Sequence, residues 1–103
     1  MLNLNVRTRV YLAVGPTDLR KGFGGLYAVV KQKLNEDPLS GHYFVFCNRS
    51  QTGIKVLAWD GSGLWVCAKR LEKGRFDWPD RTGPRQIHNE TLLLILSGLQ
   101  TTS

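Results

Sequence analysis

The sequence of 103 residues is poor in the residues that usually build reactive centres. It holds only two cysteines and two histidines, and none of them falls in a CxxC or HxxxH spacing. A zinc site of the usual kind therefore finds no ligand set here. A serine or cysteine nucleophile needs a histidine base beside it, and no motif places one there. The residues therefore predict no catalytic centre, no bound metal and no cofactor.

The chain also lacks long hydrophobic runs and an export signal. Its apolar runs, such as Leu92 to Leu96, are far too short to cross a bilayer. The first residues, MLNLNVRTR, hold no apolar core followed by a cleavage site, so we expect no signal peptide. Two cysteines without an export signal favour reduced thiols. We therefore expect a cytoplasmic protein that has no membrane partner.

Acidic residues are few relative to basic ones. Eight Asp and Glu stand against 14 Lys and Arg, which gives a formal net charge of +6 and an isoelectric point near 9.8. This balance favours anionic partners, with nucleic acid first among them. The length leaves room for one domain, residues 1–103, with one modest core.

The central stretch from His42 to Leu71 is typical of an antiparallel β-meander. Three runs rich in β-branched and aromatic residues are separated by two groups of turn residues. Gly61 can supply the positive φ of a two-residue turn, which would set Trp65 opposite Ala58.

The register of the first hairpin decides which side chains share a face of this sheet. If Phe46 pairs with Val56, one face carries Phe44, Phe46, Val56, Ala58, Trp65 and Cys67. A one-residue slip would exchange the faces of the first strand. Both faces are largely apolar in either register, whereas a sheet open to water on one side alternates apolar with polar residues. We therefore expect cover on both faces, by helices of this chain or by a partner.

The segment before the meander predicts a strand and a helix. Val6 to Val14 alternates apolar with polar residues, as a half-buried strand at a sheet edge does. Thr17 then fits an N-cap, and apolar residues recur at helical spacing from Asp18 to Leu34. The apolar stripe consists of Leu19, Phe23, Leu26, Val30 and Leu34.

Three glycines, Gly22, Gly24 and Gly25, fall inside this predicted helix. Each costs about 1 kcal/mol relative to alanine, so we expect the helix to approach a strand closely there. A phosphate-binding loop is the alternative, but the GK[ST] ending of a P-loop is missing.

The segment after the meander predicts a short strand at Arg85 to His88 and a helix capped by Asn89, with Glu90 in its first turn. This helix either covers the second face of the sheet or docks on another chain. Its apolar side would consist of Leu92, Leu93, Ile95, Leu96 and Leu99, with Gly98 as its end. The predicted fold class is therefore α+β: a small antiparallel meander of about four to five strands, an amphipathic helix near the N-terminus and a short C-terminal helix.

The most basic stretch runs from Lys69 to Pro79 and holds Phe76 and Trp78 among its cations. Such a mixture suits a single strand or a distorted duplex, through phosphate contacts and stacking on the two rings. The alternative is a solvated strand end followed by a tryptophan that packs in the core. We predict two sets of phosphate contacts. The first set consists of Arg20, Lys21, Lys69, Arg70, Lys73 and Arg75. The second patch consists of Arg7 and Arg9.

Three segments together resemble one family. They are PTDLRKGFGGL at 16–26, DPLSGHYFVFCNR at 37–49 and IKVLAWDGSGLWVCAKRLEKGRFDWP at 54–79. They are similar to the small accessory protein, TnpB or Orf2, of bacterial insertion sequences of the IS66 type, which is unrelated to the RNA-guided nucleases that share the name TnpB. The resemblance implies a role in transposition beside a separate, larger transposase that carries the strand-transfer chemistry. It implies no catalytic or ligand residues.

Three functions are compatible with these observations. A non-catalytic accessory factor would bind DNA at the ends of the element through its basic surface. An adaptor would dock on the transposase, or on another protein of the element, through the doubly apolar sheet and the leucine-rich helix. A small metal-dependent nuclease would lose its cleavage activity when either Asp60 or Asp77 is changed. The first two functions are compatible with each other. Both are also compatible with a homo-oligomer.

Overall fold

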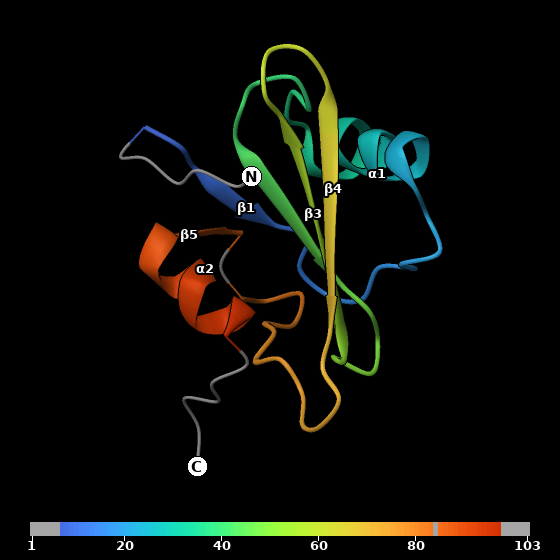
Figure 1. The fold of residues 1–103 in the computed structure, drawn as a ribbon, viewed down its shortest axis with the longest axis vertical. Helices are drawn as coiled ribbons and strands as arrows, with labels where there is room; N and C mark the ends of the chain where they lie inside the picture. The colour runs from blue at the N-terminus through green and yellow to red at the C-terminus, as the bar shows by residue number, and fades with distance from the viewer. Residues whose placement is uncertain (1–6, 84, 98–103) are drawn as a thin grey trace.

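The computed structural model describes residues 7–83 and 85–97, which form a five-stranded mixed sheet with helices on both faces (Figure 1). The strands lie in the order β4-β3-β2-β1-β5. Their bounds are Val10–Leu12 for β1, Tyr43–Cys47 for β2, Gly53–Trp59 for β3, Leu64–Arg70 for β4 and Gln86–Ile87 for β5. The helical elements are α1 (Phe23–Val29), the π-helix η1 (Val30–Leu34) that continues it, and α2 (Asn89–Leu96). The architecture is therefore α+β.

The predicted meander is confirmed by β2, β3 and β4, which pair antiparallel. The N–H of Asp60 donates to the carbonyl of Gly63 at 3.1 Å, and Gly61 between them has a φ of +99°. Trp65 lies opposite Ala58, as predicted. The residue pairing of the β3–β4 hairpin could therefore be predicted from its turn.

The first hairpin takes the slipped register, in which Val45 pairs with Val56. The pairing of Phe46 with Val56 is therefore wrong. Asn48 is the reason: its Oδ1 accepts the N–H groups of Thr52 and Gly53, both at 3.0 Å, and its own N–H donates to the carbonyl of Gly53 at 3.2 Å. The turn closes at this pair, so each β2 side chain lies on the face opposite to the one first considered.

The strand β1 is an interior strand, not the edge strand expected over Val6 to Val14. It pairs parallel with β2 and antiparallel with β5, so the sheet is mixed and not a pure meander. Parallel neighbours need a crossover connection, and α1 with η1 provides it. Arg7 and Arg9 precede the strand and are exposed. Val6 lies outside the described residues.

The first helix begins at Phe23 and not at Asp18, and Gly22 in place of Thr17 is its N-cap. Asp18 instead accepts the N–H of Arg20 at 3.0 Å in a turn that precedes the helix. The N–H of Thr17 donates to the carbonyl of Cys47 at 2.8 Å and extends the sheet contact. Leu26 and Val30 are buried as predicted, whereas Phe23 is 54% exposed.

The glycines at the start of α1 are not explained by close approach to a strand. A Cβ atom added at Gly22 or Gly24 would meet no atom within 4 Å. At Gly25 it would come within 2.9 Å of Cβ of Lys21, a neighbour on the same segment. The expected strand contact is therefore wrong at these positions.

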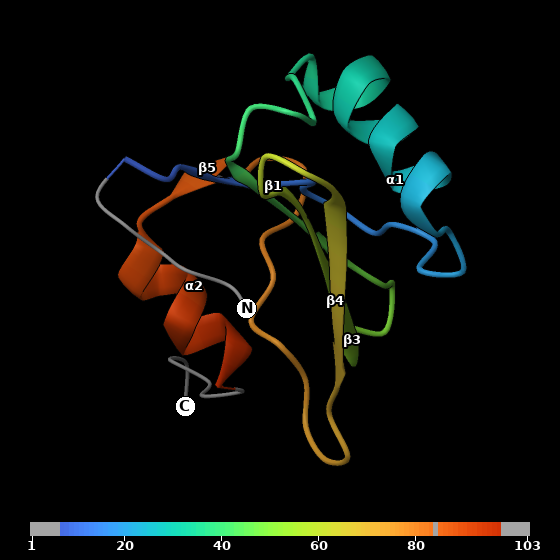
Figure 2. The ribbon, with the colours of Figure 1, turned by 45° about the horizontal axis from the view of Figure 1, so that its top comes forward.

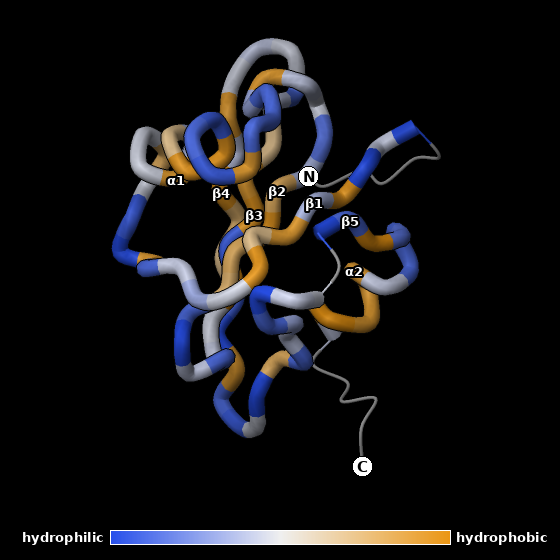
Figure 3. The backbone as a smooth tube through the Cα atoms, turned by 180° about the vertical axis from the view of Figure 1, so that it is seen from behind, coloured by the Kyte–Doolittle hydropathy of each residue, from blue (hydrophilic) through white to orange (hydrophobic). Residues whose placement is uncertain are grey.

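The sheet separates two hydrophobic cores, with α1 and α2 on opposite sides (Figure 2). On one side α1 and η1 pack on the sheet; the buried residues there include Leu26, Val29, Val30, Phe44, Phe46 and Leu57. On the other side α2 and the segment after β4 pack on it, with Phe76, Trp78, Leu92, Ile95, Tyr43 and Val56 buried. Figure 3 shows hydrophobic residues along the central strands and hydrophilic residues in the loops. The chain's own elements therefore cover both faces.

The C-terminal helix α2 begins at Asn89, and its N-cap is His88 in place of the predicted Asn89. Leu92 and Ile95 face the core, but Leu93 is 56% exposed and does not belong to the apolar side. The predicted contributions of Gly98 and Leu99 lie outside the described residues. Neither α2 nor any other described helix has the length and apolar character that a membrane span requires.

Cys47 is completely buried at the end of β2, and this burial raises the pKa of its thiol to about 12. At pH 8 such a thiol holds roughly a thousandfold less thiolate than a free cysteine. We expect Cys47, isolated in a Cys67→Ala variant, to react with Ellman's reagent only after denaturation. The converse Cys47→Ala variant leaves the partly exposed Cys67, which should react in the native protein. Equal native rates for the two variants would contradict the burial of Cys47.

Candidate nucleic-acid interface

Three loops lie along one end of the sheet, and two of them form the lower end in Figure 1. The first is the turn between β2 and β3. The segment after β4 joins it, since Leu71 and Phe76 donate their N–H groups to the carbonyls of Thr52 and Gln51 at 2.8 and 2.7 Å. The β1–α1 loop reaches the same end through the bond from Thr17 to Cys47. Backbone hydrogen bonds therefore hold the three loops side by side.

These loops, with the last residue of β4, carry six exposed cations, which we together call the basic end. Its members are Arg20, Lys21, Arg49, Arg70, Lys73 and Arg75. Arg49 could not be predicted as a member from the sequence, because its turn belongs to no basic run. Lys55 of β3 lies beside Lys21, since its Nζ donates to the carbonyl of Lys21 at 3.1 Å. The fold, and not the order of residues along the chain, brings these loops to one end.

The other predicted contacts lie elsewhere. The Nζ of Lys69 donates to the carbonyl of Leu96 at 2.5 Å, at the C-terminal end of α2, where a cation is favoured by the helix dipole. Lys69 therefore has a structural partner. Arg7 and Arg9 lie at the opposite end of the sheet, where the N–H of Tyr43 donates to the carbonyl of Arg9 at 2.9 Å. The second patch is thus separate from the basic end.

Phe76 and Trp78 are core residues, 2% and 8% exposed. Gln51 holds this segment down, since its Nε2 donates to the carbonyls of Phe76 and Trp78 at 3.3 and 3.4 Å. The indole Nε1 of Trp78 donates to the carbonyl of Gly15 at 3.2 Å. Neither ring offers a free face to a base. The burial of both rings favours the alternative of core packing over base stacking.

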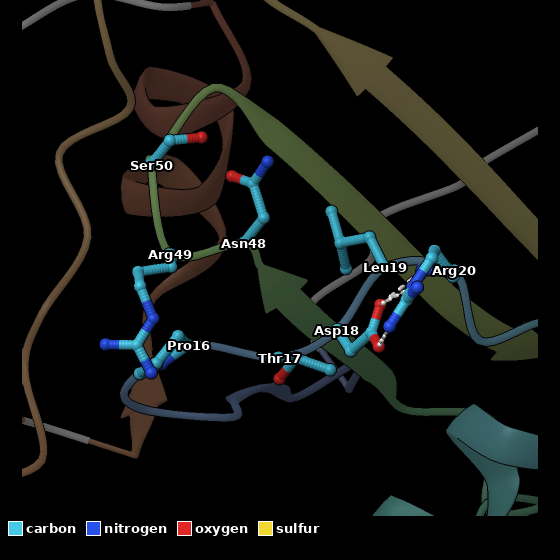
Figure 4. Close-up of a pocket in the computed structure, with 8 residues that line it drawn as sticks. All are labelled: Pro16, Thr17, Asp18, Leu19, Arg20, Asn48, Arg49 and Ser50. Atoms are coloured by element: carbon cyan, nitrogen blue, oxygen red, sulfur yellow. Dashed lines mark hydrogen bonds and ion pairs between the residues drawn. The ribbon is translucent and has the colours of Figure 1, made fainter.

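An open depression of about 790 Å³ lies between two of the loops (Figure 4). One wall is the β1–α1 loop with Arg20, and the other is the turn after β2 with Arg49. Both loops follow the carboxyl ends of parallel neighbours, the usual place of ligand sites in βαβ units. We call this hollow the Arg20–Arg49 depression.

Arg20 is folded back onto Asp18 in this depression, with Nη2 2.7 Å from Oδ2 and Nε 3.0 Å from Oδ1 (Figure 4). These side-chain hydrogen bonds hold the pKa of Asp18 well below its ordinary value and raise the pKa of Arg20. Both side chains are exposed, so solvent screening leaves the pair with little net stability. A phosphate that approaches the depression can therefore compete for this guanidinium.

The two carboxylates required by the nuclease hypothesis lie at opposite ends of β4. Asp60 precedes the strand and Asp77 follows it, so a seven-residue strand of about 3.3 Å per residue separates them by roughly 20 Å. Within residues 7–83 and 85–97, no three His, Cys, Asp or Glu side chains form a metal-binding group. The described residues thus bring no such pair together.

Asp60 has a structural role in the β3–β4 turn. Its Oδ1 accepts the N–H of Ser62 at 2.8 Å and its Oδ2 accepts Nε1 of Trp65 at 2.7 Å, which hold the pKa of the carboxyl well below its ordinary value. A lowered folded-state pKa stabilises the fold above the unfolded pKa of about 3.9, and this contribution disappears as pH falls through the folded-state pKa.

We therefore expect Asp60→Asn to lower the melting temperature at pH 7, with a difference from wild type that shrinks as the pH falls below about 4. Thermal unfolding followed by circular dichroism from pH 7 to pH 2 measures this difference. A difference that stays constant over the whole range would show that the charge of Asp60 contributes nothing.

Comparison with known proteins gives matches along nearly the whole chain. The family described as "IS66 Orf2 like protein" matches residues 8–103. The uncharacterized protein y4hO of Sinorhizobium fredii is 41% identical over 100 residues, which is 96% of this chain and 87% of that protein. The uncharacterized protein y4jC of the same organism is 36% identical over 95 residues, 91% of this chain and 81% of that protein. No solved structure matches the chain.

Proposed function

The chain belongs to the IS66 Orf2-like family of insertion-sequence proteins, and on this premise we propose that it is a non-catalytic accessory protein that binds DNA during transposition. The DNA-binding surface is the basic end. Its partners are the DNA at the ends of the element and, in the same assembly, the transposase that carries out strand transfer.

The observation that supports this proposal is that three loops joined by backbone hydrogen bonds at one end of the sheet carry six exposed cations. Asp18, Glu72 and Asp77 are the acidic residues on these loops, against six cations, and Asp18 is already paired with Arg20. A surface of this kind gains affinity for a polyanion because each neutralised phosphate releases condensed counterions. Arg49 and Arg70 supply planar guanidinium groups, which can donate two parallel hydrogen bonds to one phosphate.

A gel-shift titration at two salt concentrations tests the proposal, with DNA from the element's end and random DNA of the same length. We expect binding to both, with a log–log salt slope of about −0.9 for each phosphate contacted on duplex DNA. Binding that is absent at low salt would refute the proposal. Equal affinity for the two DNAs would assign the recognition of the element's ends to the transposase.

A second function, docking on the transposase, is favoured by the open edge of β4. The N–H of Leu71 points toward Thr52, and backbone groups alternate along a strand, so those of Val66 and Ala68 point away from β3. No strand covers this edge within the described residues. Trp65 of β4 is 43% exposed and Leu93 of α2 is 56% exposed. An exposed sheet edge can accept a strand of another protein.

Co-expression with the transposase, followed by a pull-down, tests this docking. Val66→Pro removes an N–H at the open edge while leaving the pairing with β3 in place. We expect the transposase to co-purify with wild type and less with the proline variant. Failure of wild type to co-purify would refute docking and leave DNA binding untouched.

A further inference from the structure

A second cleft, of about 500 Å³, shares the residues Pro16 to Asp18 with the Arg20–Arg49 depression. Four cationic side chains from three segments line it. They are Lys21 before α1, Lys33 of η1, and Arg81 and Arg85 of the linker between β4 and β5. We call it the Lys33–Arg81 cleft. Three of its four cations, Lys33, Arg81 and Arg85, are not among the phosphate contacts predicted from the sequence.

The chain fixes Arg81 at this cleft through Gly15. Gly15 has a φ of +76°, and a Cβ atom there would come within 3.2 Å of Cγ of Arg81, so the arginine stem lies where a side chain would stand. Trp78, buried two residues before the turn at Asp80, donates to the carbonyl of Gly15. Oδ1 of Asp80 accepts the N–H and the hydroxyl of Thr82 at 2.9 and 2.6 Å, which closes the turn that carries Arg81.

The other walls are anchored independently. The carbonyl of Arg85 accepts the N–H of Leu12 of β1 at 2.6 Å. Lys33 belongs to η1, a π-helix, and helical turns of this kind are rare and occur frequently at functional sites. The C-cap of η1 is Asn35, which has a left-handed φ of 53°. The four cations are therefore held around one hollow by separate parts of the fold.

The cations of the cleft form no ion pairs within the described residues: among residues 7–83 and 85–97, no carboxylate pairs with Lys21, Lys33, Arg81 or Arg85. Asp18 also lines the cleft, but its carboxylate is held by Arg20. Like charges around one hollow repel each other, and this repulsion destabilises the folded state. A bound anion would remove the repulsion.

The rest of the lining is mostly apolar: Ala13, Val14, Pro16, Val29 and Leu34. A ligand that fits such a cleft carries a multiply charged anionic group beside a largely uncharged face. A nucleotide has this composition, since its phosphate accepts hydrogen bonds from guanidinium and ammonium groups while its sugar and base cover apolar surface.

We propose that the Lys33–Arg81 cleft binds a nucleotide unit of a DNA strand, with the phosphate held by Lys21, Lys33, Arg81 and Arg85. This inference rests on the proposed DNA-binding function and extends it. The basic end supplies many phosphate contacts, whereas this cleft takes one strand segment at a defined position.

Titrations with three small probes at constant ionic strength test the cleft directly: inorganic phosphate, 5′-phosphorylated dithymidine and unphosphorylated thymidine. Amide chemical shifts of ¹⁵N-labelled full-length protein report binding. We expect the dinucleotide to bind more tightly than inorganic phosphate and to shift amides at 13–21, 29–34 and 81–85. Equal affinity for inorganic phosphate would overturn the nucleotide assignment, and no shift with any phosphate probe would overturn the site.

Arg81→Gln and Lys33→Gln are expected to weaken dinucleotide binding about tenfold or more each, since a charge-assisted hydrogen bond is lost. Lys31→Gln is the matched control, because Lys31 is exposed on the same η1 and does not line the cleft. If Lys31→Gln and Lys33→Gln lose equal affinity for the dinucleotide, the effect depends only on net charge and the proposal is wrong. Unchanged melting temperatures exclude misfolding.

The gel shift separates failure of the cleft from failure of the proposed function. If wild type binds duplex DNA while Arg81→Gln binds both DNA and dinucleotide as wild type does, the cleft inference alone is wrong. If wild type binds no DNA at low salt, the proposed function is wrong, whatever the small probes show.

Discussion

Replacing Arg49, Arg70 and Lys73 with glutamine is expected to reduce affinity for duplex DNA by about two to three orders of magnitude at 0.1 M salt. Each lost phosphate contact flattens the log–log salt slope by about 0.9, so three contacts flatten it by about 2.7. The three residues come from two loops and the end of β4, and all are exposed. Fluorescence anisotropy of a labelled duplex at several salt concentrations measures both quantities.

The matched control removes the same number of charges from elsewhere, by glutamine replacement of Arg7, Arg9 and Lys31. This variant tests the second patch of the sequence-based hypothesis at the same time. We expect it to lose less than about fivefold in affinity, through net charge alone. If it loses as much as the first variant, the basic end is not the interface, and binding follows total charge or the patch before β1.

Phe76→Ala is expected to lower the free energy of unfolding by about 3–5 kcal/mol, because the ring is buried between the sheet and α2. In a chain of this size such a loss lowers the melting temperature by about 15–30 °C. The control is Phe23→Ala, which removes the same atoms from a ring that is 54% exposed and should cost less than about 0.5 kcal/mol.

Urea unfolding of the two variants distinguishes core packing from base stacking. If Phe76 stacked on a base, its loss would weaken DNA binding and leave the fold intact. A Phe76→Ala protein as stable as wild type would contradict the structure. A Phe23→Ala protein as unstable as Phe76→Ala would show that α1 also buries its first residue.

The strands of the meander could be predicted because their signals are local. Alternating apolar residues mark each strand, and Gly61 with Asp60 sets the second turn. The first turn depended on one side chain, Asn48, which hydrogen-bonds two N–H groups and shifts the register by one residue. A preference for turns does not reveal which pair of residues closes the turn.

The beginning of the helix was misplaced for a related reason. Thr17 and Asp18 have the composition of a helix start, yet Thr17 continues the contact with β2, and Asp18 binds Arg20. Periodicity then extended the stripe through Phe23, where the helix has only begun and the ring faces solvent. Local propensity was overridden by tertiary contacts at each of these positions.

The candidate site was predictable only in part. Charge balance and the run from Lys69 to Arg75 indicated a basic surface. The sequence could not reveal that Arg49 joins that surface, or that Lys33, Arg81 and Arg85 surround one cleft, because these residues come together through folding. Composition was equally unable to separate a stacking tryptophan from a buried one at Trp78.

The most direct test of the account is to map where duplex DNA touches the folded protein. Amide chemical shifts of ¹⁵N-labelled protein, titrated with a duplex from the element's end at low salt, provide this map. The account predicts shifts concentrated in the three loops of the basic end, at 16–22, 48–52 and 70–77, with β4 before residue 69 and α2 unchanged. Shifts concentrated on α2 and the open edge of β4, or spread evenly over the molecule, would contradict it.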